Sequence, residues 1–553
     1  MIYPAWLNQI GDRNPQLLRE WRGRLQVRSF LVTLGLVVLG EVLFATSYIN
    51  RLPGPDRSYS VFCLNGYSPN CLIDWGGWWL SMFRDLNWLM PFVIFLPGIY
   101  GLITDINQEQ QKGTLNVLRL SPRSSQNILL GKLLGVPSLP YTALLVAFPL
   151  HAYVALQVPN GLGFLISYYA VFGLTGAVLF TAALFIGFTG RGGQNMPMAW
   201  VSGNALAGLA LAGLVIIPSL WTWNSITVWN FFPQFLTTWS NGPASRVDWF
   251  TMPINRNPFL AHLFTLSNLA IITFLLWKIL QRSFRNPKTT LISKRQSYGI
   301  VGYGTVLMVG FAMQSDYVTD KLSQDYWLGI VSLLSSAMTI AFLPLVLSLS
   351  IPRQMALDWL QSRKAVALHH REQTGKWPSP WRKAALSDLI WGEKSPGILP
   401  IAINLLLVTV TLLLPLSFVE NADQFRAILG LGIGASLVLL YGLIVQWMLL
   451  LQTPKRTIWA VGSLSFAVLF PPLAAFILVI GNSDSLLAKF LMLFSPGFWT
   501  ILGPDLGTDR TLATGIGVIA LIVQWILIAG IGNTLWLRYR QLSRALQPSD
   551  SVA

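Results

Sequence analysis

The sequence predicts an all-α protein that crosses a membrane about twelve times, with both termini in the cytoplasm. Hydrophobic residues make up 53% of the 553 positions and charged residues only 11%, and the mean hydropathy is +0.55. This composition differs strongly from that of a soluble domain. Lys and Arg gather in every second gap between apolar runs, as in membrane proteins with positive cytoplasmic loops. We therefore do not interpret the net charge of +16 as a sign of a nucleic-acid partner.

Apolar runs long enough to cross a bilayer, about twenty residues each, define the predicted spans. They cover residues 29–49, 88–104, 134–157, 162–188, 199–220, 259–280, 299–314, 327–351, 398–419, 427–451, 457–480 and 513–536. We expect a first six-helix bundle at 29–280, a basic cytoplasmic linker at 281–298, a second six-helix region at 299–536 and a basic cytoplasmic tail at 537–553. Gly430 and Gly434 stand four residues apart, which favours close helix packing.

Three longer segments lie outside the spans. Residues 1–28 carry leucines among arginines, which fits a cytoplasmic helix in the membrane interface and equally a simple positive anchor. The outer segment 221–258 is rich in Trp and Phe but broken by Asn and Pro, so we expect short helices in the outer interface. The basic cytoplasmic loop 352–397 has room for one interfacial helix and is too short for a catalytic domain.

A few polar residues and both cysteines are candidates for special roles. Glu41 lies within a predicted span, where a carboxylate is a functional candidate, although it could also reach the outer headgroups or be protonated. Gln446 and Gln524 could pair helices or line a path. Cys63 and Cys71 share one predicted outer loop, and the sequence fits a disulfide and two free thiols equally well.

Residues 105–133 form a polar and amphipathic interruption between two spans, and we predict two short cytoplasmic helices there. Gly113 and Thr114 can open the first helix, with the Thr hydroxyl as its cap. Leu115 and Leu118 then share one face, and Val117 could also fall on it. Ser121-Pro122 is typical of a second helix start, with Ser as the cap and Pro at the first helical position.

This segment resembles the one that follows the second span in type 2 ABC exporter permeases. The similarity rests on E-x-x-x-G-T-L, a following leucine, S-P, I-L and G-K, and it extends over residues 1–285 through the order of the first six spans. In that family the segment is a coupling helix held in a cleft of a separate ATP-binding subunit. The residues that the resemblance assigns to this contact are Glu109, Lys112, Gly113, Thr114, Leu115, Leu118, Arg119, Ser121, Pro122 and Arg123. The family's second carboxylate is Gln111 here, so Glu109 would make the acidic contact alone.

The resemblance implies a permease subunit of an ABC exporter in the bacterial cytoplasmic membrane. We expect Leu115 and Leu118 to be the apolar anchor, with the charged residues around them as a polar rim. The inside gap after the tenth span is too short for a second coupling helix, so we expect a homodimer or a pair with another permease. Membrane lipid is the other expected partner.

The sequence lacks motifs for chemistry of its own. No G-x-x-x-x-G-K-[ST] phosphate loop occurs, so ATP and Mg are expected on the partner ATPase. No metal-binding or nucleophile motif occurs either, and we expect no catalytic residue, no cofactor and no metal on this chain. Two alternatives are a membrane enzyme acting on a lipid or lipid-linked sugar at segment 221–258, and a secondary transporter. The first has few ionisable residues there, Arg246, Asp248 and Arg256. The second lacks a series of buried ionisable groups.

Overall fold

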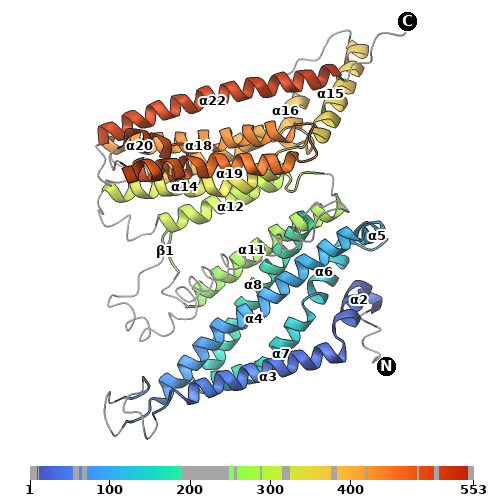
Figure 1. The fold of residues 1–553 in the computed structure, drawn as a ribbon, viewed down its shortest axis with the longest axis vertical. Helices are drawn as coiled ribbons and strands as arrows, with labels where there is room; N and C mark the ends of the chain where they lie inside the picture. Colours follow the sequence, from blue (N-terminus) through green and yellow to red (C-terminus); the bar gives the residue numbers. More distant parts are fainter. Residues whose placement is uncertain are drawn as a thin grey trace. The chain divides into compact units, whose positions relative to one another are not determined.

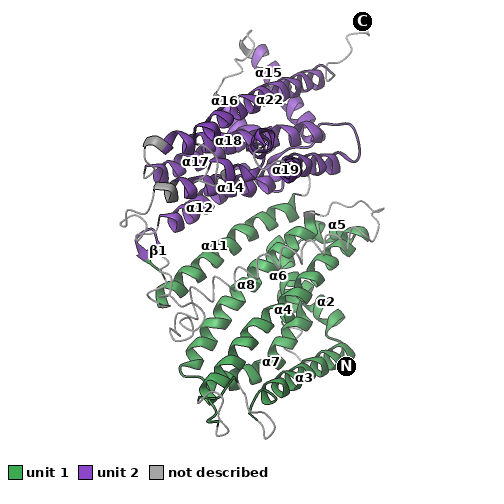
Figure 2. Cartoon of the chain, turned by 60° about the vertical axis from the view of Figure 1, so that its left-hand side comes forward, with its two compact units in different colours: residues 1–247, 253–287 green, residues 248–252, 288–553 purple. Residues whose placement is uncertain are grey.

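A computed structural model describes residues 9, 11–53, 61–64, 71–189, 248–254, 258–286, 289–313, 324–374, 383–417, 421–481, 485–502 and 510–545. These residues are almost entirely helical, apart from a hairpin of two very short strands, β1 (Asp248–Trp249) and β2 (Met252–Pro253). The chain divides into two compact units, Met1–Val247 with Pro253–Pro287, and Asp248–Met252 with Lys288–Ala553 (Figure 2).

The first unit is built around one long helix. Its helices are α2 (Pro15–Arg24), α3 (Val27–Ile49), α4 (Trp75–Gln111), α5 (Thr114–Leu120), α6 (Ser125–Gly135), α7 (Ser138–Leu156), α8 (Gly161–Thr189) and α11 (Pro258–Arg285) (Figure 1). α4 packs against α7 and α8, α8 packs against α11, and α3 packs against α7. The side chains that α4 turns inward, including Ile94, Leu102 and Ile106, are at most 1% exposed.

The second unit is organised around α18. Its helices are α12 (Lys294–Ala312), α14 (Gln324–Leu349), α15 (Arg353–Thr374), α16 (Lys383–Trp391), α17 (Ile398–Leu416), α18 (Asn421–Leu449), α19 (Arg456–Gly481), α20 (Leu486–Met492), the 3-10 turn η3 (Pro496–Phe498), α21 (Trp499–Leu502) and α22 (Arg510–Ala545). α18 contacts α14, α17, α19 and α22. A Cβ on Gly434 would lie 3.2 Å from the Thr339 hydroxyl and 3.3 Å from the Phe498 ring, which confirms close packing at this glycine.

Ten helices in the described part of the chain are long and apolar enough to cross a membrane: α3, α4, α7, α8, α11, α14, α17, α18, α19 and α22. They match ten of the twelve predicted spans, so an all-α multi-pass membrane protein is confirmed. The predicted span 299–314 falls on α12, which is not among the ten. The predicted span 199–220 lies outside the described residues, as does most of segment 221–258.

The segments between spans contain more helix than predicted. The loop 352–397 holds two helices, α15 and α16, where one was predicted. α22 continues through Ala545 and α11 through Arg285, so both extend beyond the ends of the predicted spans. Residues 15–24 form the helix α2, capped by Asn14, whose side chain accepts from Leu17 N, with Pro15 at the first helical position.

Buried glutamines tie helices together in the second unit. Gln446 on α18 accepts from Ile351 N at 3.1 Å and donates to Ile351 O at 2.9 Å. Gln524 on α22 accepts from the Ser436 hydroxyl on α18 and donates to Leu493 O at 2.9 Å. Both side chains are fully buried, and these bonds support the helix-pairing interpretation.

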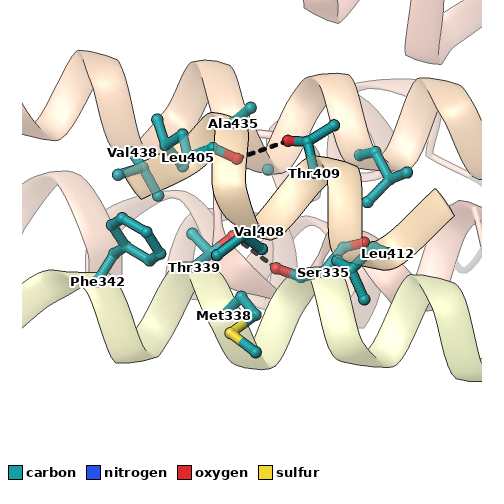
Figure 3. Close-up of a pocket in the computed structure, with 12 residues that line it drawn as sticks. Ser335, Met338, Thr339, Phe342, Leu405, Val408, Thr409, Leu412, Ala435 and Val438 are labelled. Carbon is teal, nitrogen blue, oxygen red and sulfur yellow. Dashed lines mark hydrogen bonds between the residues drawn. The ribbon is translucent and has the colours of Figure 1, made fainter. Parts of the chain in front are cut away.

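A small pocket in the second unit lies between α14, α17 and α18 (Figure 3). Its lining is mainly apolar, and its hydroxyls come from Ser335, Thr339 and Thr409. Each hydroxyl donates to a carbonyl one turn earlier on its own helix. The pocket thus shows no polar group that is arranged to recognise a substrate.

Candidate functional site

The predicted cytoplasmic segment forms a compact turn between α4 and α7. α4 continues as one helix through Gln111, and the chain then reverses at Gly113, whose φ of 72° lies in the left-handed region that favours glycine. The short α5 and the eleven-residue α6 follow, and α7 begins at Ser138. Two short helices therefore connect two long ones, as the sequence predicted.

The capping residues of these helices differ from the prediction. Gly113 precedes α5, and the Thr114 hydroxyl donates to Glu109 O at 3.3 Å, so it does not cap backbone N–H groups. Ser121 is the C-cap of α5, and its hydroxyl donates to Leu118 O. Pro122 lies between α5 and α6. Ser124 caps α6 by accepting from Asn127 N. Two serines, Ser121 and Ser124, precede α6 in the sequence, and the later one caps the helix.

The predicted apolar anchor of α5 faces inward. Leu115 is only 2% exposed and belongs to the core of the first unit, and Leu118 packs partly buried against that core. Val117 and Leu120 lie on the outer side and are 69% and 87% exposed. Leu115 and Leu118 do share a face, but as core residues. The exposed apolar face of α5 is therefore Val117 and Leu120, which we call the α5 outer face.

Arg119 is committed to an internal contact as well. Its Nε donates to Phe284 O at 2.9 Å, and its guanidinium lies 5.7 Å from the centre of the Phe284 ring. Burial lowers the pKa of Arg119 below its ordinary value. Arg285 also reaches Ser125 with a 3.5 Å bond, so the end of α11 supports both short helices. Arg119 is therefore a support of α5 in this structure, and not part of its outer rim.

A buried group of charges fixes α2 against α4 and α6. Lys132 on α6 is fully buried, and its Nζ lies 2.6 Å from Asp105, 3.0 Å from Glu109 and 3.4 Å from Glu20. Two arginines of α2 complete the group: Arg19 pairs with Glu109 and Glu20, and Arg24 pairs with Asp105 at 2.7 Å and with Glu20 at 3.4 Å. We call these residues the Lys132 cluster.

The charges of the Lys132 cluster balance, because three carboxylates face one lysine and two arginines. Burial opposes the ammonium charge of Lys132, but Asp105, Glu20 and Glu109 together raise its pKa above 10.5. Lys132 is thus held protonated. The three carboxylates approach within 4.8 Å of one another, a spacing that a metal ion could bridge, yet here the lysine supplies the cation between them.

The backbones of α2 and α6 approach closely at two glycines. A Cβ on Gly131 would lie 2.9 Å from Leu17 N, and one on Gly135 would lie 2.6 Å from Glu20 Cβ. A four-residue glycine spacing lets two helices approach in this way. This close approach places Lys132 of α6 against α2, where its ammonium pairs with Glu20.

The prediction missed most of the Lys132 cluster. It placed Glu109 on an exposed rim, but Glu109 is only 7% exposed and pairs inside the protein. Glu20, Asp105, Arg19 and Arg24 were not singled out. The available signal was the pair of glycines around Lys132, together with an N-terminal helix rich in arginine. Of the predicted contact residues, Lys112, Thr114, Pro122 and Arg123 are exposed.

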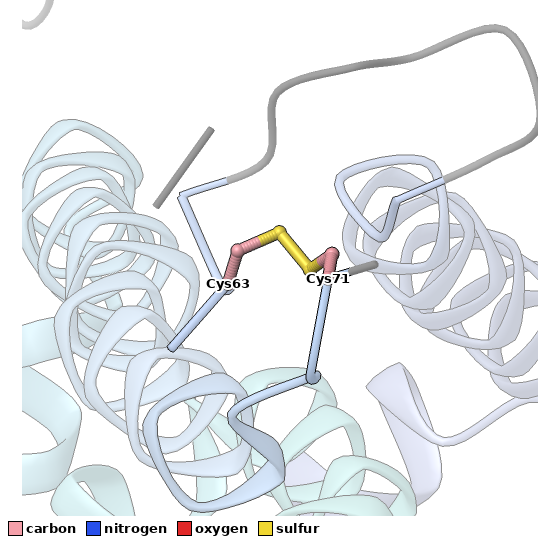
Figure 4. Close-up of a disulfide and its surroundings, with 2 residues drawn as sticks. All are labelled: Cys63 and Cys71. Atoms are coloured by element: carbon pink, nitrogen blue, oxygen red, sulfur yellow. A yellow bond between two sulfur atoms is a disulfide. The ribbon is translucent and has the colours of Figure 1, made fainter. Parts of the chain in front are cut away.

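The remaining candidates lie away from this segment. Cys63 and Cys71 form a disulfide with their Cα atoms 5.3 Å apart, in the loop between α3 and α4 (Figure 4). Within the described residues, Glu41 Oε1 on α3 is covered and makes no hydrogen bond. Nothing brings Glu41 to the Lys132 cluster, so it remains an isolated candidate.

The chain matches no known protein-family model, no curated protein and no solved structure. Its class follows from the fold alone, which is that of a multi-pass α-helical membrane protein.

Proposed function

We propose that this protein is the membrane-spanning permease subunit of an ABC exporter, moving a substrate with energy from a separate ATPase subunit. The observation that carries the proposal is the α4–α5–α6 turn, because it joins two long apolar helices through a short helix with exposed apolar side chains, Val117 and Leu120. The similarity of this segment to the coupling helix of type 2 ABC permeases supports the same function. The absence of a phosphate loop from the sequence fits an ATPase on another chain.

The proposed topology has twelve spans and cytoplasmic termini, in a bacterial cytoplasmic membrane. Two independent features support this orientation. In the first unit, basic residues concentrate in α2 and in residues 105–133: Arg19, Arg22, Arg24, Lys112, Arg119, Arg123 and Lys132. The Cys63–Cys71 disulfide lies before the first residue of α4, at the opposite end of that helix from α5, and disulfides persist in oxidising compartments.

Mechanically, a push on α5 would be transmitted to several helices together. Two residues anchor α5: Leu115 is buried in the core, and Arg119 donates a hydrogen bond to Phe284 O on α11. The Lys132 cluster joins α2, α4 and α6. Movement of a partner ATPase below α5 would therefore tilt α4 together with its neighbours, and substrate would pass between two such bundles, in a homodimer or with a second permease.

The test is purification of the tagged full-length chain from its own cells. A companion protein with a nucleotide-binding motif and ATPase activity should co-purify. The double variant Val117→Asp, Leu120→Asp should lose it, whereas Val61→Asp, at a similarly exposed site (78%) in the loop between α3 and α4, should keep it. Substitutions at Leu115 would not be informative because that side chain is buried. If no ATPase accompanies the unmutated chain, the proposal is wrong.

A further inference from the structure

From the charges around α5, we infer that the partner surface seated on the α5 outer face is an apolar pocket bordered by acidic side chains. This inference rests on the proposed function and adds the chemistry of the partner. The first step is the apolar contact. Val117 and Leu120 are three residues apart on one helix and therefore lie side by side. Together they present an exposed apolar face that a pocket could cover.

The second step is the sign of the charges beside this face. Residues 105–133 contain two carboxylates, Asp105 and Glu109, and both are held in the Lys132 cluster. The charged side chains that remain exposed in this segment are Lys112 and Arg123, one before α5 and one after it. The rim is therefore basic, and a complementary partner has to be acidic.

The neighbouring helix strengthens the positive charge. In and before α2, Arg13 and Arg22 are exposed, while Asp12 is the exposed carboxylate among the described residues of this helix region. Glu20 is buried within the Lys132 cluster. An acidic partner would therefore meet little repulsion at this end of the unit. A basic partner would be disfavoured, because like charges that face each other at an interface cost free energy.

The third step distinguishes a protein from an anionic membrane surface. The apolar run in α4 ends at residue 104, but the helix continues to Gln111. At 1.5 Å per residue this extension is about 10 Å long. The headgroup layer on one side of a bilayer is only about 6 Å thick, so α5 extends beyond the lipid headgroups. A protein surface can reach Leu120 there, and lipid cannot.

The experiment places a photo-crosslinking phenylalanine analogue at position 120 of the full-length chain in its own cells. The matched control carries the same probe at position 61, which has similar exposure, 78% against 87%. Crosslinked partners are identified by mass spectrometry, down to the peptide. The second arm measures crosslinking from position 120 in Lys112→Glu, Arg123→Glu and the double variant. Lys455→Glu, an exposed lysine on the proposed cytoplasmic side, controls for a simple change of net charge.

We expect position 120, and not position 61, to crosslink to a protein with a nucleotide-binding motif, at a peptide that contains Asp or Glu. The double charge reversal should lower the yield about ten-fold, and Lys455→Glu should leave it unchanged. An ATPase that crosslinks equally well to the charge-reversed chain would overturn the acidic rim but leave the proposed function intact. An ATPase that co-purifies without crosslinking at position 120 would likewise overturn the acidic rim and leave the proposed function intact. The absence of any ATPase by either method would reject both proposals.

Coverage of the α5 outer face by lipid is tested separately in nanodiscs. A cysteine at position 120, in a chain with Cys63→Ser and Cys71→Ser, should react with a water-soluble maleimide at equal rates in neutral and in anionic nanodiscs. A rate that falls several-fold in anionic nanodiscs would show that lipid binds this face and would overturn the inference.

Discussion

Lys132 on α6 lies with its Nζ 2.6 Å from Oδ2 of Asp105 on α4, although the two residues are 27 positions apart in the sequence. Lys132 also reaches Glu20, which is 112 residues away. A fully buried ammonium with three carboxylates is stabilising only as a complete set, because each ion loses its hydration on burial. α2 is therefore fixed to the α4–α6 turn by charges that depend on one another.

Lys132→Met should destabilise the protein strongly. The substitution leaves carboxylates buried without their central cation, and breaking a buried pair from one side costs about 3–5 kcal/mol. Thermal unfolding of the purified chain in detergent should show a clear fall in Tm, and a second substitution, Asp105→Asn, should restore part of it. Lys112→Met, at an exposed lysine of the same segment, should change Tm little. Equal Tm values for the two single variants would show that the Lys132 cluster is not structural.

Gly131→Ala should separate α2 from α6. The added methyl group would lie 2.9 Å from Leu17 N, which is a backbone atom and cannot rotate away. Overpacking of this kind costs about 1–3 kcal/mol. Hydrogen exchange should rise in α2, and Tm should fall. Gly173→Ala is the control, because a Cβ there has nothing within 4 Å and alanine is the better helix former. If α2 exchanges no faster in Gly131→Ala than in Gly173→Ala, the close approach of α2 and α6 is not maintained in solution.

The sequence could predict the spans, but not which face of α5 points inward. A span needs only a run of apolar residues, which is a local property of the sequence. Ten helices of the described chain confirm spans predicted in this way. α5 has leucine or valine on both sides, with Leu115 and Leu118 on one and Val117 and Leu120 on the other. Which side points inward depends on tertiary contacts, such as the packing of α5 on α4 and the bond from Arg119 to Phe284 on α11. Helical spacing therefore grouped Leu115 with Leu118 correctly, but it did not separate Val117 from them and it assigned this side to the surface.

The Lys132 cluster was beyond local analysis for a similar reason. A lysine at the start of an apolar run ordinarily extends its ammonium to water. Lys132 does not, because Gly131 and Gly135 let α2 cover it with Glu20. Pairing over such separations depends on tertiary packing, which one sequence does not reveal. The sequence also underestimated α4, whose polar final turns after residue 104 remain helical.

Lys294 should make the stability of the second unit depend on pH. Its Nζ is buried and donates to Leu389 O at 2.6 Å and to Ser395 Oγ at 2.5 Å. Burial lowers the pKa of Lys294 from 10.5 to about 8, although Asp388 opposes the shift. Between these values the unfolded chain binds a proton that the folded chain has lost. Stability therefore rises with pH across this range, by at most about 1.4 kcal/mol per pH unit.

The measurement compares Tm of the unmutated chain and of Lys294→Met from pH 7.5 to pH 10.5. The difference between the two proteins should change with pH in favour of the unmutated chain, because methionine has no proton to lose. Below pH 8 the difference should be constant, since Lys294 is protonated in both the folded and the unfolded states. Lys455→Met, which removes an exposed lysine, should show no such change. A pH-independent difference would mean that Lys294 titrates at its ordinary value.

Labelling of cysteines should place the disulfide loop outside the cell and α5 inside it. In intact cells, a membrane-impermeant maleimide should label Cys63 and Cys71 after mild reduction, because their loop is joined to the outer end of α4 in the proposed topology. A chain with Cys63→Ser, Cys71→Ser and Leu120→Cys should be labelled only after the cells are permeabilised, although position 120 is highly exposed. Labelling of position 120 in intact cells would invert the orientation and remove α5 from the reach of any cytoplasmic ATPase.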